Sequence, residues 1–327
     1  AALPLPVVLA AAAHIARIIG AHYRRHPRSS RCASNTMGVR PQGARVRGVA
    51  PSAIRRQGSF PTSVAAMTGI RNPEALVLGA GGTVGFGVVG ALLEVGSPVL
   101  AVGREGARMS ALAQHFADEP GLTLLPSGCI NNDEDAARLA KIVRKRKRPL
   151  RAVFASLASP WESGRLLDRP ADFLRRKLEL DLIPHLAAAR HLLPLLAESN
   201  ETAHYILIGG PHAERGWAGY GHASITAAAM RMLAQVLHEE ANAMGVRVQM
   251  LSVDQPISTP ANECNACAEW PSALAVGRCA VSLLSRTGVA AAPIVTYTSE
   301  RARPPEKTLF SDFPASPWTA ADHGRDR

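Results

Sequence analysis

The segment ALVLGAGGTVGFGVVGALLEVG, residues 75–96, constrains the fold most, because an apolar run, a glycine-rich turn and an apolar helix pattern follow one another directly. Gly79, Gly82 and Gly85 form a GxxGxxG spacing in this turn. The first glycine permits a tight reversal, the second lets a pyrophosphate approach the backbone, and the third lets the helix pack on the strand. The first helical N–H groups, at Thr83 and Val84, then face the phosphates. The spacing predicts a dinucleotide site, and the alternative is a tight turn without a ligand.

From Glu74 onward, short apolar runs alternate with helical segments, which predicts a parallel sheet with crossover helices. Strands are expected at residues 75–78, 99–102, 122–125, 152–155, 205–208, 246–251 and 294–297. Helices are expected to start near Thr83, Glu105, Asp133, Ala171, Tyr220 and Pro271. The predicted fold class is α/β, a single doubly wound parallel-sheet domain over residues 74–298. A basic arm, residues 1–73, precedes this domain, and an extended polar tail, residues 299–327, follows it.

The arm carries the whole excess of positive charge in a chain whose formal net charge is +11. It contains eleven arginines, no lysine and no acidic residue before Glu74. This composition is typical of a mitochondrial or plastid transit peptide, and it also suits an anionic partner. Residues 1–28 have the pattern of an amphipathic helix that could contact anionic lipid at a membrane surface. A helix spanning the membrane over residues 3–23 is less expected, because it would bury His14 and Arg17.

The second predicted strand ends in AVGRE, where NAD-binding proteins usually present an acid to the ribose 2′-hydroxyl. Arg104 stands there instead, and an arginine suits a 2′-phosphate. The residue therefore predicts NADP(H) as the cofactor, unless Arg104 is an ordinary surface arginine.

Residues 74 to about 297 resemble the short-chain dehydrogenase/reductase family. The resemblance rests on GAGGTVG, on the GR after the second strand, on DLIPHLAAARHLLPLL, and on Tyr220 before a helix that ends in EEANAMGVRVQML. It implies a Rossmann fold in which Gly79, Gly82, Thr83, Val84, Gly85, Arg104, Ala155 and Tyr220 contact the cofactor.

The resemblance also implies a catalytic tyrosine at Tyr220, with three partners that this sequence lacks. The lysine expected four residues later is Ser224, and the expected asparagine is Asp181. Gly209 and Gly210 end the fifth strand, where a serine is expected. Without the charge of the lysine, a tyrosine is a poor proton donor or acceptor near neutral pH. Tyr220 is therefore expected to be vestigial, although His222 and Ser224 could in principle substitute for the missing groups.

These features predict a non-catalytic, NADP(H)-binding accessory subunit of a large respiratory-chain assembly, similar to the NADPH-binding accessory subunit of respiratory complex I. The expected location is the matrix side of the mitochondrial inner membrane, with a plastid as the alternative. One alternative function is an active NADPH-dependent carbonyl reductase. Another is a subunit associated with the mitochondrial ribosome. RNA is the less expected partner, because the arm has only Tyr23 and Phe60 as aromatic residues.

Two further motifs have ordinary interpretations. The run KIVRKRKRPLR, residues 141–151, follows the acids Asp133, Glu134 and Asp135, so we expect a solvated helix end more than a specific anion contact. Cys264 and Cys267 form a lone CxxC with no second ligand pair nearby, so no metal site is predicted and the thiols are expected to be reduced. The sequence leaves the role of this pair open.

Overall fold

The structure is a computed structural model that describes residues 74–125, 128–146, 148–199, 202–259, 262–285 and 292–302. Within these ranges, seven parallel strands form one sheet in the order β3-β2-β1-β4-β5-β6-β7. The strands are β1 Glu74–Leu78, β2 Val99–Val102, β3 Leu122–Leu125, β4 Leu150–Ala155, β5 Ala203–Gly209, β6 Val246–Ser252 and β7 Ile294–Thr296. The sheet confirms the predicted doubly wound α/β class. The arm and its expected amphipathic helix lie outside the described residues.

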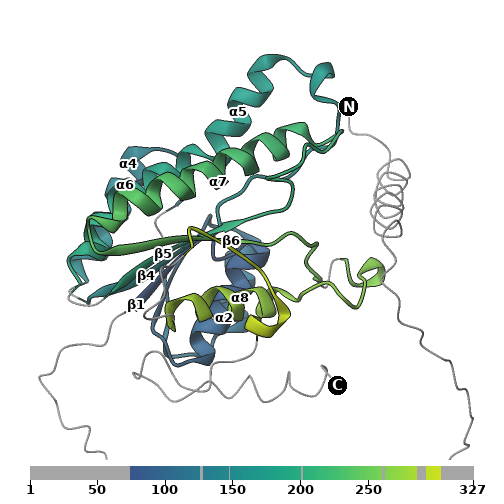
Figure 1. Cartoon of the computed structure of the whole chain (residues 1–327). Helices are drawn as coiled ribbons and strands as arrows, with labels where there is room; N and C mark the ends of the chain where they lie inside the picture. The colour runs from purple at the N-terminus through teal and green to yellow at the C-terminus, as the bar shows by residue number, and fades with distance from the viewer. Residues whose placement is uncertain are drawn as a thin grey trace, which may run out of the picture. The chain divides into compact units, whose positions relative to one another are not determined.

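Helices cover both faces of the sheet (Figure 1). One face carries α4 Asp133–Lys145, α6 Ile183–Ala197 and α7 Gly221–Asn242, with α5 Ala171–Asp181 leading into α6. The other face carries α2 Thr83–Glu94, α3 Ala107–His115 and α8 Ala273–Ser282. Because both faces are covered, the central strands are apolar over most of their length, as is usual for parallel sheets.

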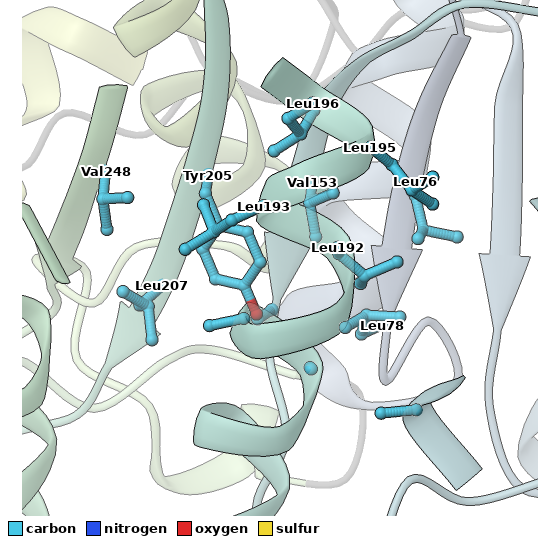
Figure 2. Packing of buried hydrophobic residues seen from close by; sticks show 14 of the residues in the cluster. Leu76, Leu78, Val153, Leu192, Leu193, Leu195, Leu196, Tyr205, Leu207 and Val248 are labelled. Carbon is cyan, nitrogen blue, oxygen red and sulfur yellow. The ribbon is translucent and has the colours of Figure 1, made fainter. Parts of the chain in front are cut away.

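The alternation of side chains along β1 divides the core into two layers. Leu76 and Leu78 pack under the helices of one face, whereas Ala75 and Val77 pack under those of the other. Figure 2 shows the first layer, in which Leu192 and Leu193 of α6 lie over side chains from β1, β4 and β5. All of these side chains are buried, so burial of apolar area on both faces holds the sheet together.

Helix α2 crosses α8 at two glycines. A Cβ atom at Gly87 would lie 1.8 Å from the carbonyl oxygen of Ala273, and one at Gly277 would lie 2.1 Å from that of Gly87. Beside this crossing, Arg278 Nε donates to the Glu94 carboxylate at 2.8 Å, and both side chains are buried. The close crossing and the buried ion pair fix α2, the helix whose N-terminus follows the glycine turn.

Most predicted elements are found within two residues of their expected ends, and the differences have physical causes. Tyr220 caps α7 and is not its first helical residue, and Ser272 caps α8 by accepting the N–H of Ala275 at 3.1 Å. The one helix start expected between β4 and β5, near Ala171, corresponds to two helices, α5 and α6, which meet at Leu182, with Pro184 in the first turn of α6. A proline has no N–H to continue the preceding helix but suits a first turn.

The basic run at the end of α4 forms ordinary ion pairs. Arg144 pairs with Glu198, and Arg146 Nε donates to the buried carboxylate of Glu74 at 3.2 Å. The tail begins as a 3₁₀ turn, Ser299–Ala302, in which Ala302 packs against the second core layer. The expectation that residue 299 begins an extended segment is therefore wrong for this turn, because an apolar side chain anchors it. The rest of the tail is outside the described residues.

Candidate functional site

The candidate site lies at the carboxyl ends of β1 and β4, where the strand order reverses. From β1 the chain proceeds outward through β2 and β3, then returns to β4 on the other side of β1. Such a reversal leaves a crevice in which doubly wound proteins bind their ligands. The glycine turn, Arg104, Ala155 and Tyr220 all come at or after the carboxyl ends of strands, so the fold brings the predicted residues to one edge of the sheet.

The glycine turn requires glycine at two of its three predicted positions. Gly79 has a φ of +75°, and a Cβ atom there would lie 2.1 Å from the carbonyl oxygen of Ser156. A Cβ atom at Gly85 would lie 2.1 Å from the carbonyl oxygen of Gly79. The N–H groups of Gly79 and Ala80 both donate to the Val102 carbonyl at 2.9 Å, which closes the turn against β2. Only glycine satisfies these contacts without a shift of the backbone.

The N-terminus of α2 is prepared for an anion. Gly82 caps the helix with extended backbone and no side-chain hydrogen bond, and the first turn contains no acidic residue. The N–H groups of Thr83 and Val84 therefore have no side-chain acceptor from the cap, and the helix dipole adds positive potential there. The turn and the helix end fit the pyrophosphate of a dinucleotide.

Arg104 is exposed directly after β2, and no acidic side chain in the described ranges pairs with it. Its neighbour Gly103 lies against Met109, since a Cβ atom at Gly103 would be 2.6 Å from the methionine sulfur. Ala155 ends β4, is fully buried, and pairs in register with Leu78 of β1. Arg104 is thus at the edge where a ribose would lie, whereas Ala155 packs in the core at the end of β4.

Tyr220 lies in an aromatic cluster that the sequence did not predict. We define this cluster as Trp161, His212, Trp217 and Tyr220. The ring centroid of Trp217 is 4.8 Å from that of Tyr220 and 3.9 Å from that of His212. Trp161 lies 6.2 Å from both Tyr220 and His212. Burial lowers the pKa of His212, which favours the neutral ring in this cluster.

The sequence indicated this cluster only through the positions of its residues in the chain, after strands whose carboxyl ends meet at one edge of the sheet. Trp161 follows β4, and His212 and Trp217 follow β5, so all three belong to loops at the carboxyl edge. His212 also has a φ of 77°, which is uncommon for a residue with a side chain and could not be foreseen from its neighbours.

Ser224 and His222 have structural surroundings. The Ser224 hydroxyl accepts the backbone N–H of Trp217 at 2.9 Å, and the side chain is buried. His222 is also buried, and its ring centroid lies 5.3 Å from that of Phe173 in α5. Burial lowers the pKa of His222, so its ring is neutral near pH 7. Ser224 orders the turn before α7, and His222 packs between α7 and α5.

The structure also shows what surrounds Asp181, Gly209 and Gly210, which stand where the family resemblance implies asparagine and serine. The Asp181 carboxylate accepts the N–H of Ser159 at 2.5 Å and its hydroxyl at 3.0 Å. At Gly209, an added Cβ atom would lie 1.7 Å from the terminal methyl of Met250. At Gly210 the nearest atom to an added Cβ is 3.9 Å away, on Trp161. Asp181 therefore binds the segment after β4, and the edge of β5 offers no hydroxyl.

The cysteine pair and the helices add no further site within the described ranges. Cys264 and Cys267 are exposed free thiols, and no group of three potential metal ligands occurs in the part of the chain that the structure describes. Among the same residues, no helix is both long and apolar enough to cross a membrane.

The model of the short chain dehydrogenase family matches residues 73–263, more than half of the chain. The chain belongs to this family. The match includes the glycine turn, Arg104, Asp181 and Tyr220, so every predicted site residue lies inside it. Members of the family are NAD(P)-binding oxidoreductases, and the crevice described above is where their fold holds the dinucleotide.

Solved structures of the same fold are similar over most of their length. A short-chain dehydrogenase/reductase from Mycobacterium ulcerans has a TM-score of 0.61 and 19% identity, over 71% of this chain and 90% of that one. RhlG of Pseudomonas aeruginosa, in an active-site complex with NADP, has a TM-score of 0.60 and 18% identity, over 71% and 96%. No curated protein matches the chain in sequence.

Proposed function

We propose that the chain binds NADP(H) in this crevice without the redox turnover of its family, and that it is a subunit of a large mitochondrial respiratory-chain assembly. The observation that carries the first part is Ser224. It occupies the place of the catalytic lysine, and its hydroxyl already accepts the N–H of Trp217 at 2.9 Å.

The choice of NADP(H), which carries a 2′-phosphate, is inferred from Arg104. An exposed guanidinium after β2, with no acid paired to it in the described chain, suits the 2′-phosphate of NADP(H). RhlG and a metagenomic short-chain oxidoreductase, both of this fold, have structures with NADP bound. An acid at the end of β2 would instead have favoured NAD(H).

Loss of turnover is inferred from the surroundings of Tyr220. The lysine position holds a buried serine, and the edge of β5 holds Gly209 and Gly210. In the family, the lysine at this position assists proton transfer by the tyrosine, and here a serine replaces it; a substrate carbonyl would also lack the serine hydroxyl. Such a site can bind the nucleotide, but it is poorly equipped to transfer a proton.

The role in an assembly is inferred from two surfaces. The arm, outside the described residues, has eleven arginines and no acid, so it requires an anionic surface elsewhere. The described domain has an exposed apolar face on α6 and α7, where Leu186 is 44% exposed, Met232 60% and Val236 44%. Exposed apolar faces of this kind are typical of subunit contacts, and another subunit of the assembly is the proposed occupant.

An active NADPH-dependent carbonyl reductase is the second candidate, and one observation favours it. Tyr220, the counterpart of the family's catalytic tyrosine, is retained at the N-cap position of α7 and is half-buried.

Binding and turnover should be measured together. Calorimetric titration should give tighter binding of NADPH than of NADH. Arg104→Ala should weaken NADPH binding by about tenfold or more, because a charge-assisted hydrogen bond contributes about 1.5–3 kcal/mol. NADH binding should not change, and the exposed Arg138→Ala on α4 is the matched control. Equal affinities for both nucleotides in the wild-type chain would contradict the assignment of NADP(H).

Oxidation of NADPH with a panel of aldehydes, ketones and quinones should not exceed the rate without protein. Turnover that Tyr220→Phe abolishes would instead establish the reductase. A chain that binds neither nucleotide would refute both candidates.

A further inference from the structure

Three polar side chains on one face of α5 and α6 bind the segment that follows β4. Lys177 and Asp181 are one helical turn apart on α5, so they project on the same side of it, and His185 follows in the first turn of α6. We call these three residues the polar ladder. The segment that they bind is Leu157–Glu162, between the end of β4 and the next helical turn.

Each residue of the polar ladder contacts a different part of this segment. His185 Nε2 donates to the Leu157 carbonyl at 2.8 Å. Asp181 accepts the N–H and the hydroxyl of Ser159. Lys177 Nζ donates to the Ser159 hydroxyl at 3.3 Å, to the Pro160 carbonyl at 3.1 Å and to the Glu162 carboxylate at 2.8 Å. The ladder therefore fixes the backbone at three successive points.

The two ends of the polar ladder are deeply buried. Lys177 is 5% exposed and His185 is 1% exposed. Burial of a charged amine is costly unless hydrogen bonds and an opposite charge compensate for it. For Lys177 those compensating groups all belong to the segment Leu157–Glu162, apart from the Phe173 ring, whose centroid lies 5.8 Å from Nζ. Displacement of the segment would leave the ammonium without these partners.

The segment in turn carries Trp161 to the aromatic cluster. Trp161 is 51% exposed, so no apolar core of its own encloses the indole. Its ring centroid nevertheless lies 6.2 Å from those of Tyr220 and His212. Pro160 and Glu162, the two residues that flank Trp161, are both bound by Lys177. The position of the indole therefore depends on the lysine.

We propose that Lys177, Asp181 and His185 are positioning residues that hold Trp161 as a fixed cover over Tyr220, on the substrate side of the crevice. The cover shields the tyrosine hydroxyl from molecules in solution. This inference concerns the same crevice as the proposed function, but it requires neither bound nucleotide nor turnover, so either can fail alone.

The test is nitration of Tyr220 by tetranitromethane in the full chain without nucleotide, quantified by peptide mass spectrometry. Tyr297, which is 9% exposed, is the internal reference. Lys177→Met should raise the nitration rate of Tyr220 relative to Tyr297 by about threefold or more, because the population of locally open states rises steeply when contacts are lost. Trp161→Ala should raise it as well, since it removes the cover itself.

Arg175→Met is the matched control, because Arg175 lies on the same helix but pairs at the surface with Asp172 and Glu179. In the Arg175→Met chain, the nitration rate of Tyr220 should equal that in the wild type. A Lys177→Met chain with native circular dichroism and an unchanged rate would overturn the proposal, and so would an unchanged rate in Trp161→Ala. If Lys177→Met does not fold, Glu162→Gln decides the question in the same way, because it removes the half-exposed negative charge that faces the lysine.

Discussion

Tyr205 is a buried polar residue whose hydroxyl has no hydrogen-bond partner among the described residues. Its ring lies in β5 beneath α6, within the same apolar cluster as Leu192, Leu193 and Leu207 (Figure 2). Burial raises the pKa of this phenol, so the group stays neutral at all ordinary pH values. The hydroxyl has lost its contact with water and gained no hydrogen bond in return, which makes it a cost to the fold.

Tyr205→Phe should therefore stabilise the domain. An unsatisfied buried polar group costs about 1–3 kcal/mol, and phenylalanine keeps the ring that fills the site. The urea midpoint should rise with an unchanged m-value, which indicates a change in stability alone. Tyr220→Phe, at a half-buried position, should leave the midpoint nearly unchanged. A lower midpoint for Tyr205→Phe would mean that the hydroxyl makes a stabilising contact.

At the scale of single residues, the sequence predicted those residues whose roles follow from the local backbone conformation. Gly79 and Gly85 could be predicted because a turn between strand and helix excludes any side chain there. Trp161 and Trp217 could not, because their positions depend on contacts between loops that are distant in sequence. The role of Asp181 could not be predicted either, because its partner Ser159 lies 22 residues earlier in the chain.

At the scale of elements, the crossing of α2 and α8 determines how the anion-binding end of α2 is held. A Gly277→Ala substitution would by itself favour the helix by about 1 kcal/mol. Here the added methyl group would lie 2.1 Å from the backbone carbonyl of Gly87, so the two helices must move apart. We expect a net loss of about 1–3 kcal/mol in the free energy of unfolding, as is typical of overpacking.

Urea unfolding measures this loss, and nucleotide titration should reveal weaker binding as α2 shifts. Gly216→Ala is the control, because a Cβ atom at Gly216 meets nothing within 4 Å. A Gly277→Ala chain more stable than the wild type would show that the helices separate without cost.

The polar ladder adds a pH dependence to the same group of elements. Burial lowers the pKa of His185 from 6.5 to about 4, against smaller opposing effects of its bond to Leu157 and of Asp181. Below pH 6.5 the unfolded chain binds a proton at this histidine, whereas the folded chain does so only near pH 4. The free energy of unfolding should therefore fall as the pH decreases through this window, by up to about 3 kcal/mol from this residue.

Comparison with His185→Gln between pH 7 and pH 4 isolates this contribution, because His204, whose pKa is also lowered to about 4, remains in both chains. The wild type should lose stability more steeply than the variant. Parallel curves would show that His185 can be protonated in the folded state without cost.

Most strands were predictable because they are short, largely apolar runs bounded by polar, proline or glycine residues. The division between α5 and α6 was not, because the apolar pattern continues through Leu182 and the break depends on the turn that includes Pro184. Thus local apolarity was sufficient for the sheet. Helix breaks and loop contacts, which shape the substrate side of the site, required the three-dimensional arrangement.

At the scale of the whole molecule, the charge is divided between two parts of the chain. Residues 1–73 hold eleven basic residues and no acid. Of the 37 basic residues in the chain, 37 − 11 = 26 follow the arm, where they face 26 acidic ones. The domain is therefore neutral and supplies its own ion pairs, whereas the arginines of the arm have no acid within the arm to pair with.

This division predicts that the arm and the domain can be separated by function. Deletion of residues 1–73, with a standard mitochondrial presequence added, should leave a domain that melts cooperatively and binds NADPH as tightly as the full chain. The core and the glycine turn, which support both properties, begin at Glu74. The truncated chain should no longer co-purify with the assembly, because the basic surface is lost.

Replacement of the eleven arginines by lysine is the matched control, since it keeps the charge, and it should retain at least part of the binding. A truncated chain that co-purifies at full stoichiometry would restrict the arm to targeting. Attachment would then have to come from the domain itself, where the apolar face of α6 and α7 would be the next surface to substitute.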